Sequence, residues 1–154
     1  MNTRLNRRFI LRALAAAGVL AIATGCTTQM GGAPMGDAMY TQTVTLSGAN
    51  EVPPVTTSAS GTASVTIRPD HTVTVKETVT GMTATASHIH QGAAGANGPV
   101  IVPFTKSGDN TFVTADGAKL TDAQYDAYKA GNLYVNVHSA AHPGGEIRAQ
   151  LKPM

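Results

Sequence analysis

The chain has 154 residues, with 11 Lys and Arg against 9 Asp and Glu, and a single cysteine. Four of the basic residues lie within the first 12 positions, so the chain from residue 26 onward carries seven basic and nine acidic side chains, a formal charge of −2. This balance excludes the strongly basic surface that nucleic-acid binding needs. A single cysteine also excludes an internal disulfide, so the fold must depend on core packing, strand pairing and any bound metal.

Residues 1–25 have the pattern of an export signal. A basic start is followed by an apolar run over residues 13–23 and by small residues before a cleavage point. Residues 6–12 also resemble the twin-arginine export motif, and the alternative is that the arginines form the ordinary positive flank of a Sec signal. Either route predicts a protein of the bacterial cell envelope.

Cys26 follows this run directly, and residues 22–26 resemble a bacterial lipobox. Lipid chains on Cys26 would anchor the processed protein to a membrane, facing the periplasm or the cell surface, through their buried methylene groups. The alternative is a buried structural cysteine. Residues 26–39 are rich in Gly, Met, Thr and Pro, which predicts a flexible tether, and residues 40–154 are expected to form one domain.

The domain is predicted to consist mainly of β-strands, because polar and apolar residues alternate in segments rich in Thr and Val. Strands are expected at residues 41–46, 62–67, 72–79, 85–90, 100–102, 111–114, 133–138 and 146–151. Pro69 and Asp70 predict a hairpin turn between the second and third of these, and Pro103 is expected to end the strand at 100–102. This spacing of short strands predicts an all-β sandwich.

One segment, residues 121–130, breaks the alternation and is predicted to be a short helix. Thr121 can cap its first turn, and Lys129 precedes a stop at Gly131. Tyr125 and Tyr128 recur near helical spacing and are expected to face the core.

Three histidines are the candidate metal ligands. Residues two apart in a strand point to the same face, so His88 and His90 would lie side by side. His138 ends another predicted strand and would complete a set of three nitrogens, which suits copper, zinc, iron or nickel. His71 and His142 stand beside turn-forming residues and are expected in solvated loops. The alternative for the trio is that these are ordinary surface histidines.

Four motifs occur in order along the domain, at residues 46–55, 86–92, 131–138 and 143–148. In this order and spacing they resemble the CHRD domain, which is named from the animal growth-factor antagonist chordin and is widespread in bacterial exported proteins. The resemblance covers about residues 41–152. It implies no particular reaction, since chordin copies are modules of a binding protein. A non-catalytic interaction module with an unidentified protein partner is therefore one functional expectation.

The histidine pattern is also similar, more faintly, to the copper site of the copper/zinc superoxide dismutases, which are Greek-key β-sandwiches. That similarity implies His88, His90 and His138 as copper ligands and Arg148 as the residue that draws a small anion to the metal. His142 would be a fourth ligand if its turn folds back. The zinc-binding loop and the structural disulfide have no counterpart in this sequence, so only a copper centre is implied.

The expected fold is thus an all-β Greek-key sandwich, immunoglobulin-like or superoxide-dismutase-like, with one short helix near 121–130. The first functional expectation is a lipid-anchored copper protein that acts on superoxide, and copper storage or resistance without turnover is an alternative. Arg148 has an alternative role as the partner of Glu51 or Glu146 in an exposed ion pair. Asn136 shares a strand face with His138 and is a candidate to orient a ligand.

Overall fold

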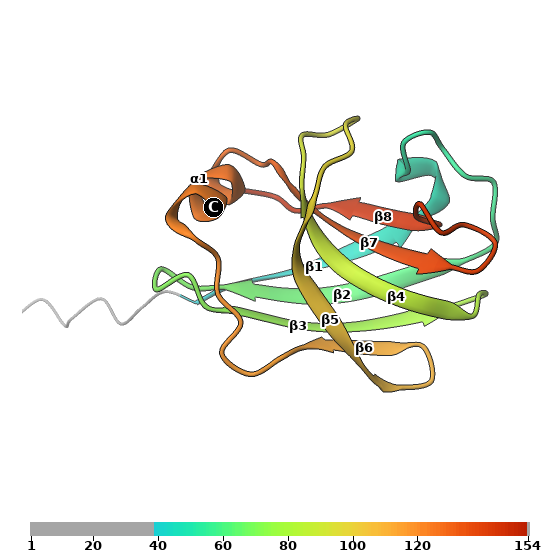
Figure 1. Ribbon diagram of the computed structural model, residues 1–154, viewed down its shortest axis with the longest axis horizontal. Coiled ribbons are helices and arrows are strands. Elements are labelled where there is room, and N and C mark those ends of the chain that lie inside the picture. The colour runs from blue at the N-terminus through green and yellow to red at the C-terminus, as the bar shows by residue number, and fades with distance from the viewer. Residues whose placement is uncertain (1–38, 154) are drawn as a thin grey trace, which may run out of the picture. The chain divides into compact units, whose positions relative to one another are not determined.

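The computed structural model describes residues 39–153 (Figure 1). The elements are β1 (Tyr40–Ser47), the 3₁₀ turn η1 (Gly48–Asn50), β2 (Ser60–Ile67), β3 (Val73–Thr80), β4 (Ala84–Gln91), β5 (Val100–Gly108), β6 (Thr111–Thr114), α1 (Asp122–Lys129), β7 (Leu133–Ser139) and β8 (Ile147–Gln150). All eight predicted strands and the predicted helix are present. Among the described residues, no helix is long and apolar enough to cross a membrane. The predicted signal, Cys26 and most of the predicted tether lie outside the described residues.

The strands form one closed antiparallel barrel in the order β1-β2-β3-β6-β5-β4-β7-β8. The expected sandwich of two sheets is wrong in this respect, because β1 and β8 meet at the pair Ser47 and Arg148 and so close the sheet on itself. A period of two residues is the same in a sandwich and a barrel, so the sequence could not separate them. Within the barrel β4, β5 and β6 are consecutive neighbours, and β6 pairs on its other side with β3; the Greek-key expectation stays a prediction.

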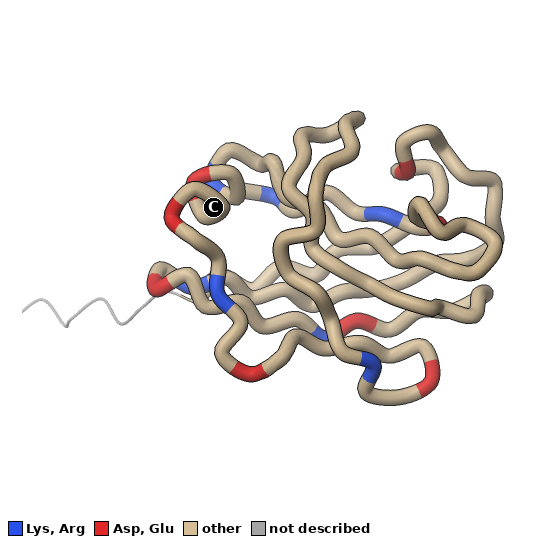
Figure 2. Tube along the Cα trace, viewed as in Figure 1, with Lys and Arg blue, Asp and Glu red and all other residues tan. Residues whose placement is uncertain are grey.

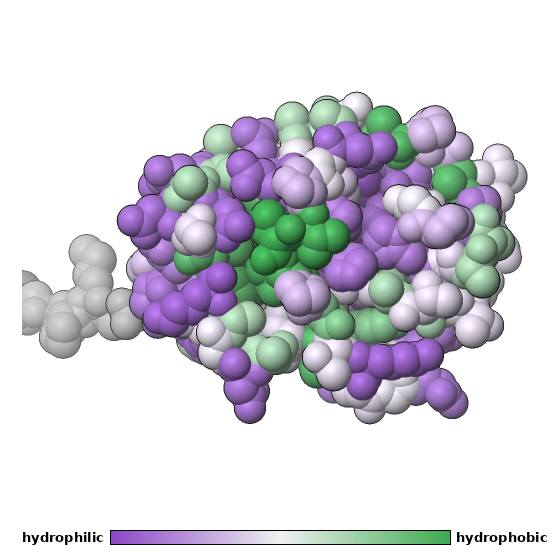
Figure 3. All heavy atoms as spheres, in the orientation of Figure 1, coloured by the Kyte–Doolittle hydropathy of each residue, from purple (hydrophilic) through white to green (hydrophobic). Residues whose placement is uncertain are grey.

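Alternating side chains of the strands fill the barrel interior. In β3, for example, Val73, Val75 and Val79 are buried, while the threonines between them face solvent. Glu77 occupies one of the inward positions of this strand and is fully buried. Hydrophobic side chains also reach the surface between β5 and α1 (Figure 3), where β5 contributes the half-buried Ile101 and Phe104.

Strand β5 continues past the residue that was expected to end it. Pro103 pairs with His88 on β4, and from Phe104 onward β5 pairs with β6 instead. The missing N–H of Pro103 is tolerated because the proline lies where the strand changes partners.

The helix α1 begins with a complete capping box: Gln124 N–H donates to the Thr121 hydroxyl, and Thr121 N–H donates to the Gln124 side chain. Tyr128 is fully buried, as predicted. Tyr125 is half-buried and stacks on His71, with ring centroids 4.2 Å apart. His71 was expected to be solvated, and its half-buried position against α1 corrects that expectation.

Candidate metal centre

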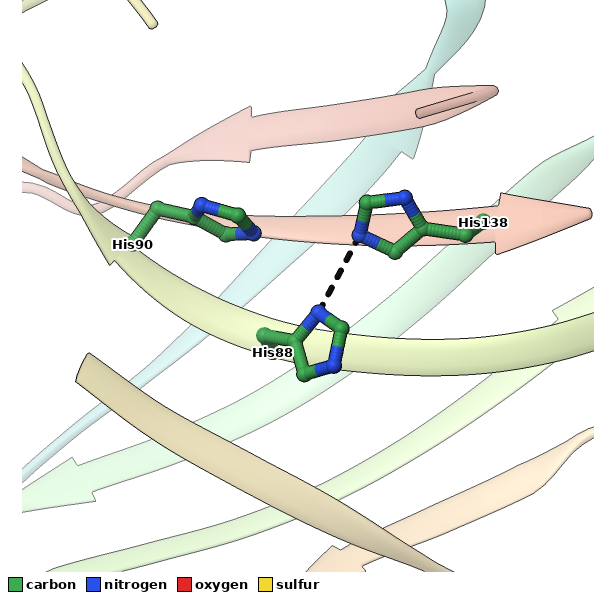
Figure 4. Close-up of side chains that lie close together, drawn as sticks. All are labelled: His88, His90 and His138. Atoms are coloured by element: carbon green, nitrogen blue, oxygen red, sulfur yellow. Dashed lines mark hydrogen bonds between the residues drawn. The ribbon is translucent and has the colours of Figure 1, made fainter. Parts of the chain in front are cut away.

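The three predicted histidines come together on the outer face of the barrel (Figure 4). Strands β4 and β7 pair so that His90 is opposite Tyr134, and Ala86 is opposite His138. Because paired residues share a face, the three imidazoles rise from the same side of the sheet while Ile89 points into the core. Each ring offers one nitrogen, and these nitrogens all lie within 4.8 Å of one another.

Two backbone carbonyls determine which nitrogen of two rings is free. Nδ1 of His90 lies 2.9 Å from the Gly98 oxygen, and Nδ1 of His138 lies 2.9 Å from the Pro143 oxygen. A carbonyl only accepts, so in both rings Nδ1 carries the proton and Nε2 has a bare lone pair. The Nε2 atom of His90 is buried and has no hydrogen-bond partner among the described residues.

The third ring, His88, points its Nδ1 at the bare Nε2 of His138 across 3.1 Å. Since that Nε2 is an acceptor, His88 Nδ1–H is the donor in the metal-free protein. This hydrogen bond is the dashed line in Figure 4. The ligand atoms facing one another are therefore Nδ1 of His88 and Nε2 of His90 and His138.

The electrostatic surroundings keep the trio uncharged. Burial, together with the smaller effects of the neighbouring His138 and His90, lowers the pKa of His88 to about 4. Burial also lowers the pKa of His90 and of His138. Residues 81–105 and 130–145 contain no Asp, Glu, Lys or Arg, so in Figure 2 the strands β4 and β7 are tan throughout. All three imidazoles are thus neutral near pH 7, which is the state that binds a metal.

Arg148 lies deeper than the sequence suggested. It is 1% exposed, and its guanidinium donates hydrogen bonds to acceptors in the β4–β5 loop and to Gln150. Among the described residues it forms no ion pair with Glu51 or Glu146, so the alternative of an exposed pair is wrong. Its role in attracting an anion stays a prediction.

His142 is outside the group of three. His142 is half-buried and lines a cavity of about 390 Å³ with Glu51 and Gly145, and its backbone N–H donates to the Ser139 hydroxyl. Its role as a fourth ligand stays a prediction. Asn136 lies between His88 and Arg148 across the sheet and donates from Nδ2 to Glu51 Oε1 at 2.6 Å.

Sequence reasoning did not identify the groups that support the ligands. These are the Gly98 and Pro143 carbonyls and the ring of Tyr134, which stacks on His90. Backbone carbonyls leave no signature in side-chain patterns. Gly98 is a residue whose type indicates that the loop packs closely on β4, because a Cβ at this position would lie 1.7 Å from the Gln91 carbonyl oxygen.

Residues 42–151 match the CHRD domain family. No curated protein and no solved structure matches the chain. The predicted resemblance to this family is therefore confirmed, while the fainter similarity to the superoxide dismutases is not shown.

Proposed function

We propose that this chain, which belongs to the CHRD domain family, binds one copper ion through His88, His90 and His138. The observation that carries the proposal is the bare Nε2 of His90, a buried lone pair without a partner among the described residues. An unpaired buried polar atom costs free energy, and a metal ion at this point would remove that cost.

The donor set fits a metal ion of this kind. Metal–imidazole bonds are about 2.0 Å long, so two nitrogens on one ion lie at most about 4 Å apart. The His88 and His138 nitrogens already meet this limit at 3.1 Å, and no pair of ligand atoms exceeds 4.8 Å. Because His88 Nδ1 carries a proton in the metal-free protein, metal binding also requires that this proton move to Nε2 of the same ring. With that change of tautomer, small ring movements suffice to bring all three nitrogens to one ion. Both Nδ1–H groups that bond to carbonyls would keep their partners, which fixes the orientation of the ligands.

Copper is favoured over other metals by the ligand types. The group consists of imidazoles alone, without the carboxylates that suit magnesium, calcium or manganese. Among divalent first-row ions copper binds nitrogen sites most tightly. Three neutral imidazoles would hold either Cu(I) or Cu(II) and leave a position open for a small ligand.

The test is copper content measured by elemental analysis after dialysis of the purified protein against a buffered copper solution. We expect one copper per chain in the wild type and none in H90A. H71A is the matched control, because His71 is a half-buried histidine that packs on α1 away from the trio. A superoxide assay on the loaded protein tests whether the centre turns over. Copper binding without dismutation would assign the site to storage or delivery. Absence of copper from the wild type would contradict the metal site and favour the alternative function, a non-catalytic interaction module.

We also propose that Cys26 bears lipid and anchors the protein in the cell envelope. This rests on the order of basic start, apolar run and cysteine in residues 1–26. Metabolic labelling with a fatty acid should mark the wild type and spare C26S. Equal labelling of both proteins would contradict the anchor.

A further inference from the structure

We propose that Arg148 is a positioning residue of the histidine site, which holds His90 in place through Tyr134 and the loop at residues 92–99. Its importance for metal binding rests on the proposed function, whereas its effect on His90 can be measured without any metal. Arg148 itself contacts none of the three imidazoles through a hydrogen bond. It acts through two routes that both end at His90.

The first route is a stack of three side chains. The Arg148 guanidinium carbon lies 3.4 Å from the centre of the Tyr134 ring, and the His90 ring lies 4.9 Å from that ring at an angle of 10°. Strand β7, which carries Tyr134, lies between β4 and β8. His90 and Arg148 therefore approach opposite faces of the phenol. The phenol ring is fixed between them, and it limits the rotation of the His90 ring.

The second route runs through the loop. Arg148 Nη2 donates to the carbonyls of Ala93 at 3.2 Å and Ala96 at 3.0 Å, and Nη1 donates to Asn97 Oδ1 at 3.2 Å. One planar guanidinium thus fixes the loop at three points, a geometry that the point charge of lysine does not reproduce. The next residue, Gly98, supplies the carbonyl that accepts from His90 Nδ1.

Tyr134 joins the two routes at Gly98. The Gly98 N–H donates to the Tyr134 hydroxyl at 3.1 Å, on the same residue whose carbonyl binds His90 at 2.9 Å. The loop backbone is therefore held on both sides of Gly98, the residue whose carbonyl sets the His90 tautomer. Because this carbonyl keeps the proton on Nδ1, it also keeps Nε2 bare for a metal.

This arrangement gives a reason for placing a guanidinium in a buried position where it forms no ion pair among the described residues. A charged group out of water is costly unless its hydrogen bonds are made. Here the acceptors are loop carbonyls and side-chain amides, so the charge is used to order a loop that contains no strand or helix. We expect the loop to lose its fixed position when the guanidinium is removed.

The experiment compares R148Q with the wild type in the metal-free protein and then with copper. Nitrogen-15 NMR of the imidazoles should show His90 as a single tautomer protonated at Nδ1 in the wild type and as a mixture in R148Q. Copper affinity, measured by competition with a chelator, should fall about 10- to 100-fold in R148Q. The matched control is R68Q, which removes the arginine that directly follows β2; within residues 39–153 its side chain hydrogen-bonds to the Met39 sulfur alone.

Y134F provides the second test if R148Q does not fold, since it keeps the ring and removes only the hydroxyl that holds Gly98. It too should give a mixture of His90 tautomers. A folded R148Q, or a folded Y134F in its place, with a single His90 tautomer and wild-type copper affinity would overturn the inference. If the wild type binds no copper, the proposed function fails, and the tautomer measurement still decides the role of Arg148.

Discussion

Replacing the buried Glu77 by glutamine should stabilise the protein above neutral pH. Glu77 is 0% exposed, and both of its carboxylate oxygens lack a hydrogen-bond partner among the described residues. Burial raises the pKa of Glu77 from 4.5 to about 7. The Ser87 hydroxyl donates its proton to the Asn136 carbonyl, so it leaves the carboxylate unsatisfied.

The expected gain in unfolding free energy follows from the pKa values of Glu77 in the unfolded and the folded chain. The unfolded chain releases its proton near pH 4.5, whereas the folded chain keeps the proton until about pH 7. Wild-type stability should therefore fall as pH rises from about 4.5 to 7 and stay lower above that range. The difference between these two pKa values corresponds to about 3 kcal/mol. Since glutamine is neutral throughout, E77Q should equal the wild type near pH 4 and exceed it by up to about 3 kcal/mol at pH 8.

Urea unfolding of the metal-free proteins, followed by circular dichroism between pH 4 and pH 8.5, measures this difference. D116N is the matched control, because it makes the same change from carboxylate to amide at Asp116, which is exposed in the loop before α1. A constant difference between E77Q and the wild type across the whole range would refute the reasoning, as would a variant that is less stable at pH 8.

Three further predictions test the turns and the metal. G145A should lower the unfolding free energy by about 1–3 kcal/mol, because residue 145 has φ +133° and a Cβ there would lie 2.4 Å from Asn136 Nδ2; an unchanged urea midpoint would contradict this. T121A should cost about 1 kcal/mol through loss of the capping box, and a loss below about 0.3 kcal/mol would show that the cap is dispensable. Copper at 100 times its dissociation constant should stabilise the folded wild type by about 2.7 kcal/mol, and a chelator should reverse the gain; H90A with an equal copper-induced rise in melting temperature would contradict specific binding.

Most of the strands could be predicted because their inner and outer faces differ in polarity. The segment at 111–114 agrees residue for residue with β6, and the predicted helix at 121–130 contains α1. The exception is β5, which continues beyond Pro103 because the strand changes partners there. Closure of the barrel was not predictable, since it depends on the pairing of Ser47 with Arg148 between strands at opposite ends of the domain.

The histidine trio was predictable for a similar reason. The spacing of His88 and His90 places both side chains on one face of β4. His138 lies near the end of the neighbouring strand β7, and its side chain points to the same face. The surroundings of the trio were not predictable, because loops determine them. Whether Arg148 points to solvent or under a loop depends on the path of residues 92–98, and no periodic pattern specifies that path.

Electron paramagnetic resonance of the protein with one equivalent of Cu(II) tests the copper site most directly. A site formed by His88, His90 and His138 should give a single spectrum with hyperfine coupling to imidazole nitrogens, and this spectrum should change in H90A and stay the same in H71A. A wild-type spectrum without nitrogen coupling, or one that H90A leaves unchanged, would contradict the site.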